Sequence, residues 1–278
     1  MSRWNPQYVI RAVDPVLSST NVVIVETDIG QGYLKAIGNP AGEHCLACEL
    51  VGTQLAEWLG LQTLDYGLIT LDASVDVIRF YSGGSAKSGP AFITRLEKGQ
   101  PWQGTRDELR KVSNPEDISR LVVFDTWIMN KDRKSALMAV PDNILLSTDQ
   151  SVPGKPRMVA IDHTHCLGAS GHDRPSLNRL ENVSDQTIYG QFAEFREFLD
   201  RTVVRDTTRR LKRLAQPTVE GIVGSIPLEW KVSQAARKRL VRVILDRAAW
   251  VAGNIEHCLL GPKHKQGSFD FGASENQP

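Results

Sequence analysis

A polar loop follows an apolar helix in the stretch Phe124-Asp-Thr-Trp-Ile-Met-Asn-Lys-Asp-Arg133. The helix has a clear start signal in Asn114 and Pro115, a capping side chain followed by proline at the first helical position, and we expect it to run to about Met129. Asp132 therefore falls on a loop at a helix end. A carboxylate there can act as a base toward a substrate hydroxyl, although the commoner role of such a residue alone is a turn or a cap.

Two short strands are predicted after this loop, from Asn143 to Leu146 and from Met158 to Ile161. Asn143 opens the first strand, and Asp162 stands at the exit of the second, which is apolar. Both side chains offer the hard oxygen atoms that Mg²⁺ prefers. Each residue taken alone is again more often a turn or a cap, so it is the pair that indicates a candidate metal site.

Further upstream, a basic residue is predicted on a strand and an acidic residue on a helix. The runs 22–26 and 33–37 read as a hairpin, with Lys35 in its second strand, and 43–59 has helical spacing. Glu49 lies on the apolar stripe of that helix, and burying a lone charge is costly, so we expect it to pair with Lys35. Protein kinases hold the lysine of the nucleotide phosphates in this way, whereas the alternative is a solvated pair at the rim of a core.

The chain as a whole divides into a small β-rich part and a larger helical part. Further strands are predicted at 66–71 and 75–81, and 91–96 reads as a last strand or a crossing segment, with a crossover near 92–101. Helices fill much of 186–259. We expect residues 1–96 to form an N-terminal β-rich lobe with one helix, residues 97–260 a helical C-terminal lobe with the catalytic loop, and residues 261–278 a flexible tail. Such a pair of lobes leaves a cleft for a ligand.

The ordered set Lys, Glu, Asp, Asn, Asp over strand, helix, loop and hairpin is much less expected by chance than any one member. The chain resembles the HipA-like kinases, and in particular their compact members, over roughly residues 15–170 and more loosely beyond. The segments that carry this resemblance are Tyr33-Leu-Lys-Ala-Ile-Gly-Asn39, 46–61, Gly89-Pro-Ala-Phe92, 124–133 and Ile161-Asp-His-Thr-His165. The resemblance implies an α+β fold of the bilobal protein-kinase type.

The resemblance also implies a role for each residue of the set. Lys35 would contact the nucleotide phosphates and Glu49 would hold it. Asp132 would orient or deprotonate the attacking hydroxyl, while Asn143 and Asp162 would bind Mg²⁺. The implied activity is transfer of the γ-phosphate of ATP, with ATP and Mg²⁺ as cofactors.

The loop 17–21 stands where a phosphate-covering turn belongs in this family. It contains Ser18, Ser19 and Thr20 and no glycine. Any phosphate contact would therefore use hydroxyl groups and backbone N–H groups.

Two departures from the family pattern concern the loop and the metal site. Family members have D-R-H-x-x-N, with the asparagine five positions after the aspartate, whereas Asn143 follows Asp132 by 11 positions and Lys134 replaces the histidine. If the inserted residues bulge outward, Asn143 still reaches the metal; otherwise Asp142 or another group substitutes. In addition, Asp162 is followed by His163 and Thr164, where protein kinases have Phe and Gly.

Zinc is an alternative reading at two places. His163 and His165 resemble a ligand pair without an evident third ligand, and two hydrogen-bonded loop histidines are the favoured interpretation. Cys45 and Cys48 form a C-x-x-C pair without an evident second pair, so two half-buried helix residues are the favoured interpretation there.

Composition limits the compartment and the partners. The chain has 41% hydrophobic residues, a net charge of +1, four cysteines, no signal-like start and no long apolar run. We expect a cytoplasmic protein with free thiols and no membrane partner. No direct nucleic-acid binding is expected, because the basic residues in 201–213 and 237–242 are predicted to lie on the solvent-exposed faces of helices.

Three functions compete at this point. The first is an active kinase, with a protein serine or threonine as the acceptor that the resemblance suggests. The second is a pseudokinase, a nucleotide-binding or interaction module, which the insertion and the glycine-free loop favour. The third is transfer of another part of ATP, such as the nucleotidyl group. The resemblance leaves an antitoxin-like protein partner possible, and we expect the chain to lack the extra N-terminal subdomain of the long family members.

Overall fold

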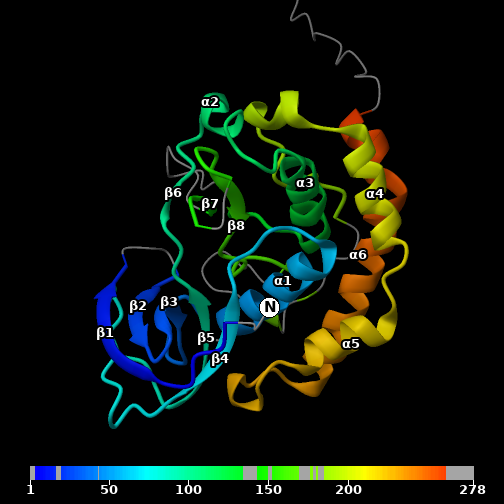
Figure 1. Ribbon diagram of the computed structural model, residues 1–278. Coiled ribbons are helices and arrows are strands. Elements are labelled where there is room, and N and C mark those ends of the chain that lie inside the picture. Colours follow the sequence, from blue (N-terminus) through cyan, green and yellow to red (C-terminus); the bar gives the residue numbers. More distant parts are fainter. Residues whose placement is uncertain are drawn as a thin grey trace, which may run out of the picture.

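The computed structural model shows two lobes, one built on a five-stranded sheet and one mainly helical (Figure 1). We describe residues 4–16, 20–42, 44–133, 143–149, 152–168, 176–177, 180 and 185–260. The predicted loop residues 17–19, residues 134–142, which include the expected six-residue insertion, and the predicted tail 261–278 lie outside this set.

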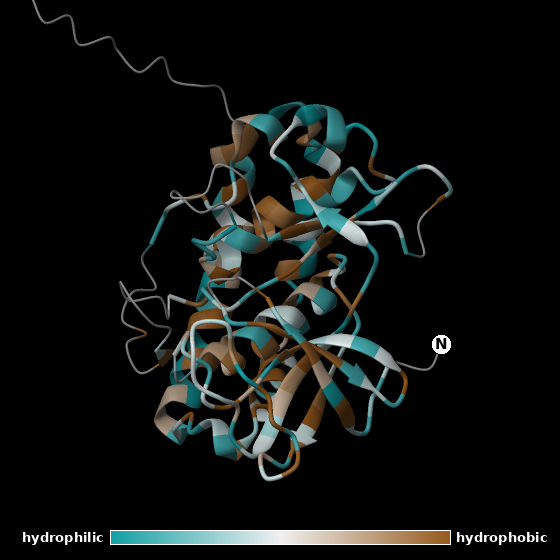
Figure 2. Cartoon of the chain, turned by 90° about the vertical axis from the view of Figure 1, so that its left-hand side faces the viewer, coloured by the Kyte–Doolittle hydropathy of each residue, from teal (hydrophilic) through white to brown (hydrophobic). Residues whose placement is uncertain are grey.

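The sheet of the first lobe is antiparallel throughout, with strand order β1-β2-β3-β5-β4. Buried positions alternate with half-buried ones along β2, and Figure 2 shows the strands of this sheet in mixed brown and paler colours. The alternation places one face of the sheet over a small core of its own. The strands are β1 (Val9–Pro15), β2 (Val23–Thr27), β3 (Gly30–Lys35), β4 (Tyr66–Leu71) and β5 (Gly89–Arg95).

The sequence predictions for this sheet are confirmed at the hairpin and wrong at one strand. Strands β2 and β3 pair from Val23↔Leu34 to Thr27↔Gly30. The predicted strand 75–81 is absent from the ladder, where only the isolated bridge Arg79↔Ser85 forms. Val75 and Val77 point to solvent, with 76% and 65% of their surface exposed. The segment is a loop rather than a strand, and it packs against the core of the sheet through Ile78 and Phe80.

Helix α1 (Cys45–Leu59) follows the hairpin and ends at Gly60, whose φ of 83° is the left-handed conformation that suits glycine. Twelve of its fifteen residues are buried. In Figure 1 it lies between the sheet and the helices of the second lobe. Its apolar side chains belong to the larger core of the molecule, together with those of α3 (Glu116–Ile128) and α6 (Gln234–Leu260).

The second lobe combines a small antiparallel sheet, β6-β7-β8, with helices. The chain enters it after β5 through residues 96–98, at the predicted crossover. Trp230 links the lobes by donating its indole N–H to the carbonyl of Pro90, at 2.8 Å. The remaining elements are β6 (Gly99–Pro101), α2 (Arg106–Leu109), β7 (Ile144–Ser147), β8 (Arg157–Ala160), the 3-10 turns Ala193–Phe198 and Leu228–Trp230, α4 (Arg201–Leu211) and α5 (Gln216–Gly224).

The start of α3 differs from the prediction. Pro115 was expected at the first helical position, but it stands at the N-cap before Glu116, and the Asn114 side chain does not cap the helix. Its amide instead exchanges two hydrogen bonds with the backbone of Met158 in β8, at 2.8 and 2.9 Å, and donates to Asp117. Asn114 thus ties the helix to the strand that leads to Asp162.

In the described part of the chain, no helix has the length and apolar character needed to cross a membrane.

Candidate active site

Lys35 reaches the interior from the last position of β3. Its neighbour Leu34 points to the core of the first lobe, so strand alternation directs Lys35 to the opposite face. The Lys35 ammonium lies 2.6 Å from Glu49 Oε2, 2.9 Å from Asp162 Oδ1 and 2.9 Å from Thr164 Oγ1. The expected contact between Lys35 and Glu49 is therefore present, and a second carboxylate joins it.

Glu49 is fixed on α1 by more than the lysine. Its carboxylate accepts hydrogen bonds from the backbone N–H of His163, 3.2 Å from each oxygen, and from the Thr164 hydroxyl, at 2.8 Å. Gly52, one turn further along α1, allows this close approach, because a Cβ there would lie 2.5 Å from the Cβ of His163. The helix and the segment after β8 are therefore fitted to each other.

Burial and charge act in opposite directions on this pair. Burial lowers the pKa of Lys35, but the carboxylates of Asp162 and Glu49 outweigh it and raise the pKa above its usual value. Burial raises the pKa of Glu49, but the charge of Lys35 and the neighbouring His163 hold it well below its usual value. Both groups are therefore ionised at neutral pH although both are buried.

Asp162 stands just after β8 in a left-handed conformation, with φ of 53°. One carboxylate oxygen accepts from Lys35, and the other accepts from the Thr20 hydroxyl at 2.7 Å. Thr20 is fully buried, and its carbonyl accepts a hydrogen bond from Asn39 at 2.9 Å. The predicted phosphate-covering loop thus contacts the predicted metal ligand through Thr20, while Ser18 and Ser19 lie outside the described residues.

Asp132 and Asn143 are brought together despite the 11 positions between them. The Asn143 amide donates to the Asp132 carbonyl at 2.5 Å and lies 3.4 Å from the Asp132 carboxylate oxygen Oδ2. The backbone N–H of Asp132 donates to Asn130 at 3.1 Å. The aspartate and the asparagine are therefore in contact, and whether Asn143 reaches a metal stays a prediction.

A cleft connects these groups. It has a cavity volume of about 300 Å³ and runs from the first-lobe sheet to β7 and β8. Lys35, Glu49, Asp162 and Asn143 all line it, and Asn143 contacts Asp132, which is not itself among the lining residues. The size falls at the lower end of the range for small-ligand sites. Its apolar lining comes from Val16, Val22, Leu64, Phe92, Leu145, Ala160 and Ile161.

Comparison with known proteins identifies the family. A family model described as HipA-like kinase matches residues 19–255. The chain belongs to the HipA-like kinase family. It is therefore a phosphotransferase by family, and its two lobes are those of a kinase-like fold. No curated protein matches the chain.

Solved structures are similar to this HipA-like kinase at low sequence identity. The Helicobacter pylori proinflammatory kinase CtkA gives a TM-score of 0.54 at 13% identity, over 92% of this chain and 99% of that one. HipA of Shewanella oneidensis, solved with HipB and operator DNA, gives 0.48 at 10% identity, over 93% of this chain and 69% of that one. At this identity the similarity to CtkA shows the fold alone.

Arg133 is a site residue of this HipA-like kinase whose role the sequence did not reveal. Its guanidinium is 1% exposed and pairs with both oxygens of the buried Asp125, at 3.0 and 2.9 Å. It also donates to the carbonyls of Asn143, at 2.6 Å, and Ile161, at 2.7 Å. Arg133 therefore holds the loop of Asp132 against the strands that carry the metal-ligand candidates, and the Asp-Arg pair in the motif was the available signal.

Among the described residues there is no group of three or more His, Cys, Asp and Glu side chains that could hold a metal ion. His163 is buried against Phe124, with ring centroids 5.4 Å apart, and its Nδ1 lies 3.3 Å from the Thr53 hydroxyl. Cys45 and Cys48 are buried free thiols, and burial raises the pKa of Cys45 to about 12. They are more deeply buried than the half-buried helix residues that we expected.

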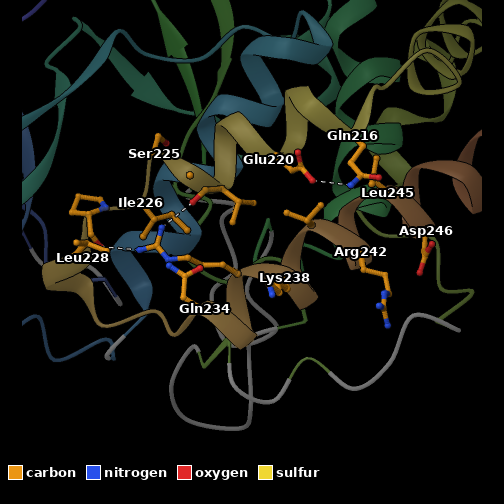
Figure 3. A pocket seen from close by; sticks show the side chains of 15 residues that line it. Gln216, Glu220, Ser225, Ile226, Leu228, Gln234, Lys238, Arg242, Leu245 and Asp246 are labelled. Atoms are coloured by element: carbon orange, nitrogen blue, oxygen red, sulfur yellow. Dashed lines mark hydrogen bonds between the residues drawn. The ribbon is translucent and has the colours of Figure 1, made fainter.

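A larger hollow, of about 1030 Å³, lies between α5 and α6 (Figure 3). The buried cation beside it, Arg237, donates to the carbonyls of Val232, Val223 and Pro227, at 3.1 to 3.2 Å. Arg237 therefore stabilises the turn after α5 through its hydrogen bonds to backbone carbonyls. Of the predicted site residues that the structure describes, none lines this hollow.

Proposed function

We propose that this HipA-like kinase uses ATP and Mg²⁺ and transfers the γ-phosphate to a hydroxyl group, that of a serine or threonine in a protein. The observation that carries the proposal is the position of the Lys35 ammonium, within 2.9 Å of both Glu49 and Asp162, where all three residues line the cleft. In kinases a strand lysine paired with a helix glutamate contacts the nucleotide phosphates, and a nearby aspartate binds Mg²⁺, so the three residues here are of the required kinds.

The donor set fits a magnesium ion. Asp162 and Asn143 both line the cleft and provide carboxylate and amide oxygens, the ligands that Mg²⁺ takes from proteins while phosphates and water complete its shell. Because the Asn143 amide nitrogen faces Asp132, its oxygen is the atom left to face a metal. The bound ion would neutralise charge on the phosphates. The apolar side chains of the cleft suit the base of the nucleotide.

The chain's own groups would then act as follows. Lys35 binds phosphate oxygens, and Glu49 keeps it oriented. Asp132 orients the acceptor hydroxyl and accepts its proton as the acceptor oxygen bonds to the γ-phosphorus. The bond from that phosphorus to the β–γ bridging oxygen breaks, and ADP leaves. This division of labour is mainly positioning and charge stabilisation.

Incubation with Mg²⁺ and γ-labelled ATP, followed by mass mapping of adducts, tests this proposal. Transfer of phosphate to the protein itself or to lysate proteins is the expected result, and transfer of a nucleotidyl group would select the third function instead.

Mg²⁺-ATP should also raise the melting temperature by mass action, and Asp162→Asn should strongly weaken that rise. Asp206→Asn, at an exposed position of α4, is the matched control. An unchanged melting temperature at millimolar Mg²⁺-ATP would refute every ATP-based function.

A pseudokinase is the second candidate. Both oxygens of Asp162 are engaged by Lys35 and Thr20, so a metal must compete with the Thr20 hydroxyl. ATP binding without transfer to the protein, to lysate or to water would favour this candidate.

The protein acceptor, an antitoxin-like partner and a cytoplasmic location remain predictions. The nucleotide and a phosphate acceptor are the partners that follow from family membership.

A further inference from the structure

The segment His163–Leu167 follows Asp162 and is fixed to α1 at its start. The His163 backbone N–H donates to both oxygens of Glu49, and the Thr164 hydroxyl donates to one of them. The side chains of His163 and Thr164 are at most 1% exposed. The first two residues of the segment therefore have little freedom to move relative to α1.

The end of the same segment is fixed as well. The Cys166 thiol lies 3.6 Å from the carbonyl of Cys48 in α1, and the Leu167 N–H donates to the carbonyl of Ile128 in α3 at 2.5 Å. Cys166 and Leu167 are buried. His165 is thus the one residue of His163–Leu167 whose side chain is not buried, with 23% of it exposed.

His165 points toward the predicted base. Its Nε2 lies 3.8 Å from Asp132 Oδ2, the same oxygen that has the Asn143 amide at 3.4 Å. Both separations exceed the usual hydrogen-bond length of about 2.9 Å, and such contacts commonly tighten only when substrates are bound. The Asp132 carboxylate is 28% exposed and lies on a loop, so it depends on neighbours for its orientation.

We propose that His165 is a positioning residue for phosphoryl transfer: it donates its Nε2–H to the Asp132 carboxylate and, with Asn143, holds that group toward the acceptor hydroxyl. The inference rests on the proposed function, in which Asp132 is the base. His165 is suited to this task because its backbone is fixed by α1 and α3 on both sides. The preceding residue, Thr164, is hydrogen-bonded to Glu49, which also binds Lys35, so the position of His165 and Asp132 is coupled to that of the lysine.

The test compares His165→Ala, His165→Gln and the control His257→Ala, at an exposed position in the last turn of α6. We expect His165→Ala to lower kcat roughly 10- to 100-fold, the scale for losing a group that orients another, while the KM for ATP changes less than about threefold. His165→Gln keeps an N–H donor and should restore most of kcat. In an Asp132→Ala background, His165→Ala should have almost no further effect.

Three outcomes would overturn the inference: an unchanged kcat in His165→Ala, a full additional loss in the Asp132→Ala background, or a loss of kcat accompanied by a lower melting temperature and no rescue by glutamine. Parent activity is measured first. A parent without transfer refutes the proposed function itself and this inference with it, whereas an active parent with an unaffected His165→Ala refutes the inference alone.

Discussion

Lys35 and Asp132 lie in the two halves of one site and are held very differently. Lys35 is buried and has three oxygen partners within 2.9 Å. The Asp132 carboxylate is 28% exposed, and its contacts to Asn143 and His165 measure 3.4 and 3.8 Å. The lysine half is therefore assembled without a ligand, whereas the Asp132 carboxylate is partly open to solvent, as the proposed function requires of a base that receives an acceptor hydroxyl.

This difference separates stability from turnover. A buried, closed set of charges is costly to break, because removing one partner leaves another charge unpaired in the interior. A half-exposed carboxylate can be removed at little cost to the fold, because water already solvates it. Substitutions in the two halves should therefore affect different properties, stability in one and turnover in the other, and should also differ in the size of their effects.

The largest effect is expected for Lys35→Met. It leaves Glu49 and Asp162 without their shared cation, so we expect about 3 to 5 kcal/mol of lost stability together with loss of transfer. Urea unfolding measures it. Arg11→Met is the matched control, since it removes the cation of the exposed pair Arg11–Glu26, at 2.6 Å, and should cost less than about 1 kcal/mol. Equal losses for the two variants would contradict the comparison.

Asp132→Ala should produce the opposite profile. Transfer should fall about a hundredfold or more, the usual scale for a positioned base, while ATP affinity stays within a few fold and the melting temperature hardly moves. Initial rates and thermal shifts with Mg²⁺-ATP measure both quantities. Asp162→Ala should impair binding and transfer together. Full transfer by Asp132→Ala would show that another group acts as the base.

The smallest effect concerns acid stability. Because the pKa of Glu49 is well below its usual 4.5, its contribution to stability is complete above about pH 4.5 and is lost only as the pH falls further, through the lowered pKa of the folded state. Glu49→Gln should therefore be less stable near neutral pH and lose less stability on acidification than the parent. Urea unfolding at several pH values measures this, with Glu26→Gln as an exposed control. Parallel pH dependences for Glu49→Gln and the parent would contradict it.

The lysine half was also the more predictable half from sequence. Glu49 stands on an apolar helical stripe that stops at Gly60, and Lys35 lies in a β-branched hairpin, so two local periodic patterns sufficed to predict their contact. The relevant information lies within 14 positions of the chain.

The parts that could not be predicted depend on contacts between distant segments. Arg133 donates hydrogen bonds to Ile161 and to Asp125. Asn114 bonds to Met158 instead of capping its own helix, because a partner that the fold brings close competes with the local backbone N–H groups. Strand β1 lacks a period-two pattern because nearly all of it is exposed and its register shifts twice against β2. Its existence depends on pairing rather than on burial.

The placement of α1 has a consequence for dissecting the chain. The helix precedes the crossover at 96–98, yet its apolar side chains complete the core that α3 and α6 build. A fragment ending at residue 96 would expose that apolar surface to water and tend to aggregate, and a fragment beginning at residue 97 would contain a helix-sized hole. Neither piece should fold alone, but the two mixed together should refold into one particle, so the crossover is a natural place to split the protein for reconstitution.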